Sequence, residues 1–183
     1  HKEVFGAEEI NTLTNLVAKI LNNPSSYNSN GLPEETLVSL RNDYLNGLNN
    51  LNVSENIITD KLPLNFQYIG FILSSMPDAK IIHIKRDPRA VCWSNLKHNF
   101  SSNGNGWAYN MQDLIDFYGL YTELMNFWHK SFPNKIYDLS YESLTKNQEK
   151  ETKKLLEYCE LKWDKNCLNF HTTKREIKTA SSA

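Results

Sequence analysis

Cysteine and long apolar runs are both scarce in this chain of 183 residues. The cysteines are odd in number and far apart, and none belongs to a Cys-x-x-Cys pair: Cys92, Cys159 and Cys167. This pattern indicates free thiols and argues against a disulfide framework or a structural zinc site. No apolar run approaches the roughly 20 residues that a bilayer-spanning helix needs. The amino terminus also has no charged-then-apolar segment typical of a signal peptide.

An excess of charge of one sign is missing as well, because 20 lysines and arginines nearly balance 21 aspartates and glutamates. The net charge of -1 gives no reason to expect a nucleic acid or an anionic membrane as partner. This net charge does not exclude a small anionic ligand that a few cationic side chains bind. The length suits one hydrophobic core, and the apolar content of 40% is ordinary for a globular protein, so we expect a single domain.

Apolar spacing predicts helices that alternate with short strands along the chain. The predicted helices cover residues 7–22, 33–50, 65–75, 88–98, 107–132 and 149–160. The predicted strands cover residues 57–60, 79–84 and 135–139, and residues 140–142 are predicted as a turn. Alternation with short connections favours an α/β fold, with a parallel sheet covered by helices on both faces.

Three side chains that can bind an anion or a nucleotide, Lys61, Arg86 and Tyr141, each follow a predicted strand. Because open parallel sheets bind ligands beyond the carboxyl ends of their strands, one crevice can collect all three side chains. Pro88 fits the first position of the helix after Arg86, so that backbone N–H groups and a helix dipole face an anion such as phosphate. Taken singly, each residue is more often a surface residue in an ion pair or a satisfied hydrogen bond.

Five segments in order carry a resemblance to a known family: residues 1–11, 60–66, 77–94, 139–144 and 179–181. The second reads Asp-Lys-Leu-Pro-Leu-Asn-Phe, the third contains Lys-Arg-Asp-Pro, and the fourth reads Leu-Ser-Tyr-Glu-Ser-Leu. They resemble signatures of sulfotransferases that use 3′-phosphoadenosine 5′-phosphosulfate. The most similar branch is the bacterial group often fused to tetratricopeptide repeats, which is similar to protein-tyrosine sulfotransferases. The resemblance implies a P-loop NTPase-like sulfotransferase fold, with a parallel sheet flanked by helices on both faces.

The resemblance assigns four residues to the nucleotide donor. It implies that Arg86 and Ser94 hold the 3′-phosphate. The chemistry agrees, because a guanidinium makes charge-assisted bonds to phosphate and a hydroxyl adds another donor. The resemblance further implies that Tyr141 is a nucleotide contact and that Ser181 is a donor near the transferred group.

The same resemblance implies two catalytic residues. Lys61 would lie by the oxygen that bridges phosphate and sulfuryl group, where an ammonium stabilises the transition state more than the ground state. Glu9 aligns with the general base that takes the proton from the acceptor hydroxyl, and its neighbour Glu8 stays an alternative.

No metal ion is expected in this chemistry. The four histidines inside the chain are scattered without ligand spacing, and we interpret them as structural or surface residues: His83, His98, His129 and His171. The implied partners are a nucleotide sulfate donor and a hydroxyl-bearing acceptor, without nucleic acid or a membrane span. A homodimer, tetratricopeptide repeats in the full-length protein and a cytoplasmic, bacterial location are expected from the same resemblance.

Compared with members of that family, the chain is expected to lack segments at both ends. The strand and Gly-containing loop that wrap the 5′-phosphosulfate would precede His1, and another basic cofactor-binding segment would follow Ala183. We therefore expect little or no transfer activity from these 183 residues alone.

Two other functions stay open at this point. One is a nucleotide-binding or protein-interaction module that kept the 3′-phosphate site but lost catalysis. The other is a kinase-like enzyme of the same P-loop architecture. The acceptor also stays open, because a peptide tyrosine, a carbohydrate and a small alcohol all present a hydroxyl.

Overall fold

The computed structural model describes residues 1–98, 100 and 105–172. The chain divides into two compact units, His1–Ala79 and a second unit that begins at Lys80. Among the described residues, no helix is both long enough and apolar enough to cross a membrane. The expectation of a single domain stays a prediction.

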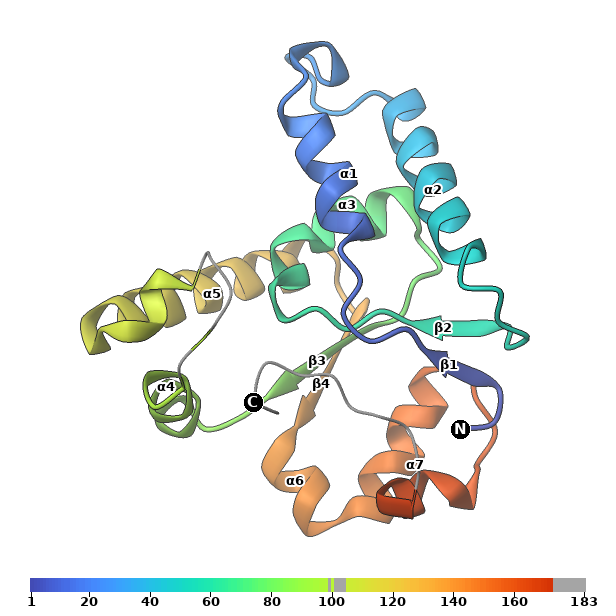
Figure 1. Cartoon of the computed structure of the whole chain (residues 1–183), viewed down its shortest axis with the longest axis vertical. Helices are drawn as coiled ribbons and strands as arrows, with labels where there is room; N and C mark the ends of the chain where they lie inside the picture. Colours follow the sequence, from blue (N-terminus) through green and yellow to red (C-terminus); the bar gives the residue numbers. More distant parts are fainter. Residues whose placement is uncertain (99, 101–104, 173–183) are drawn as a thin grey trace. The chain divides into compact units, whose positions relative to one another are not determined.

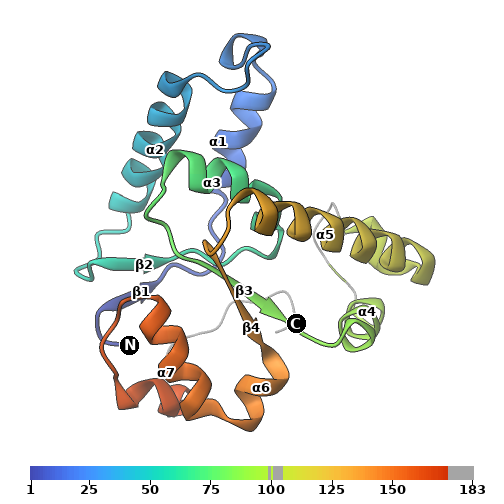
Figure 2. The same cartoon turned by 180° about the vertical axis from the view of Figure 1, so that it is seen from behind.

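The first unit combines a small parallel sheet with helices. Its elements are β1 (Val4–Gly6), α1 (Thr12–Leu21), η1 (Pro24–Ser26), α2 (Glu34–Asn49), β2 (Ile57–Thr59), η2 (Pro63–Tyr68) and α3 (Ile69–Ser75), where η marks a 3-10 helix. β1 and β2 pair in parallel, with Phe5 opposite Ile58. Figures 1 and 2 show α1 and α2 side by side from opposite directions, and α2 also contacts α3.

An apolar cluster joins α1 to α2 in this unit. Leu13, Val17 and Leu40 form its centre and are 1%, 0% and 2% exposed. Leu13 and Val17 lie four residues apart and therefore share one face of α1. Partly buried apolar side chains surround them: Leu16, Ile20, Tyr44, Tyr68, Phe71 and Ile72. The helix face predicted from the apolar spacing is the face that packs, except at Leu21, the last residue of α1, whose side chain is exposed.

The second unit is built on another pair of parallel strands. Its elements are β3 (Ile81–Lys85), α4 (Pro88–Leu96), η3 (Gly106–Tyr109), α5 (Met111–Ser131), β4 (Ile136–Ser140), α6 (Tyr141–Lys146), α7 (Gln148–Tyr158) and η4 (Lys165–Thr172). The register places Ile81 opposite Ile136 and Lys85 opposite Ser140, so both strands end at the same level. In Figure 1 the two strands lie side by side, with α4 following β3 and α6 following β4.

Helices contact both faces of the β3–β4 pair. His83 and Asp138 are register partners and lie on one face, where His83 contacts the Tyr121 hydroxyl of α5. Successive strand residues point to opposite faces, so Tyr137 lies on the other face. There its ring stacks on Tyr158 of α7, with 5.0 Å between the ring centroids. The predicted covering of parallel strands by helices on both faces is confirmed for this pair.

Every predicted strand is present, as β2, β3 and β4, and the chain is an α/β protein as expected. The helix predicted over residues 7–22 begins only at Thr12, because residues 4–6 form β1 beside β2. β1 reads Val-Phe-Gly and ends in a glycine, which is rare in strands, whereas β2 of the same length reads Ile-Ile-Thr and is wholly β-branched, so only β2 gave a strand signal.

Two further local predictions are wrong in detail. The helix predicted over residues 65–75 is a 3-10 helix until Tyr68, with Pro63 in its first turn, and becomes α-helical at Ile69. The turn predicted over residues 140–142 is instead the start of α6. The Ser140 hydroxyl accepts a hydrogen bond from the Ser143 N–H at 3.2 Å and so caps this helix.

Candidate active site

Past the end of the β1–β2 sheet, residues 7–8 and residues 59–61 continue side by side. The Ala7 N–H donates to the Thr59 carbonyl at 2.8 Å, and the Lys61 N–H donates to the Glu8 carbonyl at 2.8 Å. Glu8 has a φ of 62°, in the left-handed region, which ends the extended course of β1. Lys61, just past the carboxyl end of β2, is therefore held beside residues 8 and 9.

The side chains of Glu9 and Lys61 form an ion pair at this strand end. The Lys61 side chain is 56% exposed and the Glu9 side chain 34% exposed, so both remain accessible to a ligand. A carboxylate can accept a proton from a hydroxyl, and a neighbouring ammonium can stabilise an anionic leaving group. The structure thus brings together the two residues that the sequence predicts as catalytic.

Asp60 anchors the chain just before Lys61. The Tyr44 hydroxyl of α2 donates to Asp60 Oδ2 at 2.9 Å. Burial raises the pKa of Asp60, while its interactions with Tyr44, the Ile10 backbone and Asn65 act in the opposite direction. Burial also raises the pKa of Tyr44, and the charge of Asp60 adds to this effect. The sequence analysis assigned no role to Asp60; its place next to Lys61 at a strand end is the signal that could have found it.

The second unit brings Arg86 and Tyr141 together beyond the ends of β3 and β4. Lys85 and Ser140 are the last paired residues, so the two residues that follow them leave the sheet at the same level. The Arg86 guanidinium carbon lies 4.9 Å from the centroid of the Tyr141 ring, which is a cation–π contact. Both residues are exposed, and no carboxylate among the described residues forms an ion pair with Arg86. The guanidinium is oriented by the ring and keeps its capacity for an anion.

Glu142 links the turn after β3 to the start of α6. The Asp87 N–H donates to Glu142 Oε1 at 2.8 Å, and the Ser140 hydroxyl donates to Glu142 Oε2 at 3.3 Å. The hydrogen bond from the Asp87 backbone is the main reason that the pKa of Glu142 is lowered. Sequence analysis did not assign a role to Glu142, although its position directly after Tyr141 is a usable signal.

The helix α4 begins at Pro88, two residues after Arg86, and Asp87 is its N-cap. The Asp87 side chain caps the helix by accepting hydrogen bonds from the N–H groups of Arg89 at 2.9 Å and Ala90 at 3.1 Å. The side-chain hydrogen bond from Arg89 is the first cause of the lowered pKa of Asp87, and the Ala90 N–H adds to it. Ser94 lies further along α4 and is exposed, and no hydrogen bond joins it to Arg86. Ser181, the fourth predicted donor contact, lies outside the described residues.

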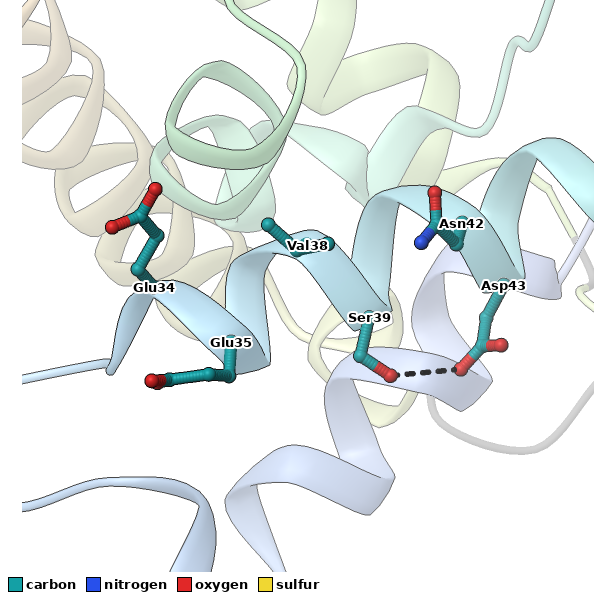
Figure 3. A pocket seen from close by; sticks show the side chains of 6 residues that line it. All are labelled: Glu34, Glu35, Val38, Ser39, Asn42 and Asp43. Carbon is teal, nitrogen blue, oxygen red and sulfur yellow. Dashed lines mark hydrogen bonds between the residues drawn. The ribbon is translucent and has the colours of Figure 1, made fainter.

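A surface depression in the first unit lies along α2 (Figure 3), lined by Glu34, Glu35, Val38, Ser39, Asn42 and Asp43. Ser39 donates to Asp43 Oδ2 at 3.5 Å within it. Three of the six lining residues carry carboxylates and none carries a cation, so this depression does not suit a ligand that bears phosphates. The two strand-end pairs, Glu9 with Lys61 and Arg86 with Tyr141, remain the candidate site residues.

Comparisons with known proteins point to one family for the chain as a whole. A profile of the sulfotransferase family matches residues 5–165. An uncharacterised protein of Aquifex aeolicus (strain VF5) is 39% identical over 150 residues, which make up 81% of this chain and 20% of that protein. A solved structure, the sulfotransferase domain from the curacin biosynthetic pathway, is similar with a TM-score of 0.54 at 12% identity. That similarity covers 91% of this chain and 61% of the solved one.

The structural similarity confirms the expected α/β sulfotransferase fold. The chain spans about a fifth of the length of the curated relative. Both strand-end pairs fall inside the stretch that the family profile matches, and this stretch covers most of the sequence. The chain therefore belongs to the sulfotransferase family.

Proposed function

We propose that the protein transfers a sulfuryl group from 3′-phosphoadenosine 5′-phosphosulfate to a hydroxyl acceptor. The contact between Glu9 and Lys61 is the observation that carries this proposal, because it pairs a proton acceptor with a cation at the carboxyl end of a strand. Membership of the sulfotransferase family supports the reaction class. The donor nucleotide is inferred from the resemblance of the motifs and from the chemistry of Arg86.

In the proposed reaction, the acceptor oxygen attacks sulfur and its proton passes to the Glu9 carboxylate. The bond between sulfur and the bridging oxygen breaks, and its electron pair stays on the phosphate of adenosine 3′,5′-bisphosphate. The Lys61 ammonium stabilises this developing charge, which is larger in the transition state than in the bound donor. Entry of the donor and acceptor would separate the two side chains, so that each contacts one side of the transferred group.

Arg86 is the proposed ligand of the 3′-phosphate. Its exposed guanidinium lies over the Tyr141 ring, and a guanidinium can bind a phosphate through two parallel hydrogen bonds. We propose that Ser94 adds a hydroxyl donor to the same phosphate and that Tyr141 contacts the nucleotide. Ser181 is proposed as a donor near the transferred group.

The acceptor and the setting of the protein are inferred from the resemblance alone. A peptide tyrosine or a carbohydrate hydroxyl is the proposed acceptor. A homodimer, tetratricopeptide repeats in the full-length protein and a cytoplasmic location belong to the same proposal.

Calorimetric titration with adenosine 3′,5′-bisphosphate tests the donor site. We expect saturable binding that Arg86→Ala weakens by about 10- to 100-fold, the range for one charge-assisted contact. Arg89→Ala is the matched control, because Arg89 is also exposed and close in sequence but pairs with Asp87 at 3.0 Å. This control should bind the nucleotide nearly as well as the unmodified protein.

Competing functions give different results in the same experiment. Preference for ATP with magnesium over the bisphosphate would point to a kinase-like enzyme and overturn the proposal. Binding that depends on Arg86, but without sulfate transfer to tyrosine peptides, carbohydrates or small alcohols in the full-length protein, would favour a module that has lost catalysis. Equal binding of the bisphosphate by the Arg86→Ala and Arg89→Ala variants would show that Arg86 is not a ligand of the donor.

A further inference from the structure

Three potential metal ligands converge on one face of the β3–β4 pair. They are His83 of β3, His129 near the end of α5 and Asp138 of β4, and one ligand atom of each lies within 4.8 Å of the others. His83 Nδ1 is 2.8 Å from Asp138 Oδ1, and His129 Nε2 is 3.3 Å from the same oxygen. His83 is far from the other two residues in sequence, so the pairing of β3 with β4 is needed to bring the three together.

We propose that His83, His129 and Asp138 form a binding site for a divalent first-row transition metal ion, with Zn²⁺ as the reference ion. Two imidazoles and one carboxylate suit zinc, cobalt, nickel and related ions. Ligand atoms about 2.1 Å from one metal ion are separated by roughly 3.0 to 3.4 Å in octahedral or tetrahedral geometry. The two contacts to Asp138 Oδ1 lie close to this range, so small side-chain rotations would complete the site.

The surroundings of His83 resemble the outer shell of a metal site. His83 Nε2 contacts the Tyr121 hydroxyl, so this nitrogen can donate its hydrogen to Tyr121 while Nδ1 faces the metal position. Ligating histidines usually donate their other N–H to a carboxylate, a backbone carbonyl or a water, which fixes the ring and its tautomer, and the Tyr121 hydroxyl oxygen can accept in the same way.

The positive charge of Lys85 opposes the binding of a metal cation at this site. Its ammonium lies 3.4 Å from Asp138 Oδ2, the carboxylate oxygen that does not contact the histidines. Oδ1 is therefore the oxygen available to the metal. Repulsion between the ammonium and the metal ion reduces the affinity of the site, which makes Lys85 a sensitive reporter of metal binding.

A metal ion at this position would have a structural effect. Its ligands come from β3, α5 and β4, so one ion would connect the long helix to both strands of the second unit. The exposed fractions of the side chains, 12% for His83 and 37% for both His129 and Asp138, leave one side open for water ligands. The inference is independent of sulfuryl transfer, because neither the proposed base nor the proposed donor ligands belong to this cluster.

Calorimetry with Zn²⁺ on the metal-stripped protein tests the proposal. We expect one site, and at a free zinc concentration of 100 times Kd the thermal unfolding midpoint should rise by roughly 5 to 10 °C. His129→Ala and Asp138→Asn should each weaken binding at least 10-fold, and Tyr121→Phe should weaken it by about 10-fold. Lys85→Met should tighten binding several-fold, because it removes a positive charge beside the site.

His171→Ala is the matched control, since His171 is an exposed histidine in η4 outside the cluster. Substitution with Co²⁺ supplies a second readout, because visible absorption bands of bound cobalt should disappear in His129→Ala and persist in His171→Ala. The proposal is overturned if zinc binds equally to the His129→Ala and His171→Ala variants. It is also overturned if Lys85→Met leaves the zinc affinity unchanged, or if the metal-stripped protein binds no zinc.

Discussion

The Glu142 carboxylate accepts a hydrogen bond from the Asp87 backbone N–H at 2.8 Å, across 55 residues of sequence. This single contact joins the turn after β3 to the start of α6 after β4. Arg86 precedes Asp87 and Tyr141 precedes Glu142, so the contact sets the distance between the guanidinium and the ring. A residue without a proposed contact to the donor thereby positions the residues that are proposed to bind it.

Glu142→Gln should change how stability depends on pH. The pKa of Glu142 is lowered in the folded protein, chiefly by the Asp87 N–H, so its contribution to stability is complete above its ordinary pKa of 4.5. That contribution is lost as the pH falls through the lower, folded value. Thermal unfolding followed by circular dichroism from about pH 7 to about pH 3 should show the variant below the unmodified protein near neutrality, with the two curves converging in acid.

The matched control for this experiment is Glu157→Gln, which changes an exposed carboxylate on α7 that forms no ion pair among the described residues. Its curve should run parallel to that of the unmodified protein. Parallel curves for Glu142→Gln as well would contradict the assigned role of the carboxylate.

The ring of Tyr141 should contribute to nucleotide affinity by orienting Arg86. Tyr141→Leu removes the cation–π contact, worth about 0.5–1 kcal/mol at an exposed site, and should weaken binding of adenosine 3′,5′-bisphosphate about two- to fivefold. Tyr141→Phe keeps the ring and should remain closer to the unmodified protein in the same titration. If the phenylalanine and leucine variants bind equally weakly, the hydroxyl rather than the ring carries the contribution.

Lys61 and Glu9 should affect the rate of sulfate transfer more than the affinity for the nucleotide. Lys61→Ala removes the cation proposed at the leaving oxygen, which should lower kcat by about 100- to 1,000-fold. Glu9→Gln removes the proposed base and should lower kcat by about 100- to 10,000-fold. Transfer from a radiolabelled donor, measured in the full-length protein, provides both values.

Glu8→Gln is the control for the choice of base. Glu8 uses its backbone carbonyl to receive the Lys61 N–H at 2.8 Å, and a glutamine retains this carbonyl. Activity should therefore change little in this variant. A larger loss for Glu8→Gln than for Glu9→Gln would reverse the assignment of the two carboxylates.

Stability of the first unit should depend on the buried face of α1. Leu13→Ala deletes a side chain that is only 1% exposed and should lower the free energy of unfolding by about 2–5 kcal/mol. Leu21→Ala makes the same chemical change on the same helix, where the side chain is 54% exposed, and should cost about 0.5 kcal/mol or less. Denaturant unfolding of both variants measures the difference, and equal losses would show that the Leu13 face is not the packed one.

Local sequence patterns determined much of the fold. The apolar spacing of residues 7–22 predicts the face of α1 that packs, apart from Leu21, and apolar, partly β-branched runs predict three of the four described strands. Both signals are local, because side-chain periodicity reflects the geometry of one helix or strand. The pattern could not reveal β1, because Val-Phe-Gly carries one β-branched residue and a glycine, so this strand depends on its pairing with β2. It could not reveal the α-helical start at Tyr141, because the α6 cap depends on Ser140 contacts.

For the candidate site residues too, part of the information lay in the sequence and part only in the tertiary structure. Sequence motifs by themselves pointed to the family, to Lys61 with Glu9, and to Arg86 with Tyr141 as residues that follow predicted strands. Only the tertiary structure decided that each pair makes contact, that Glu142 joins the turn after β3 to the start of α6, and that Asp60 is anchored by Tyr44. It also brought His83, His129 and Asp138 together. Parallel pairing and helix packing join residues tens of positions apart, and no local pattern records such a distance.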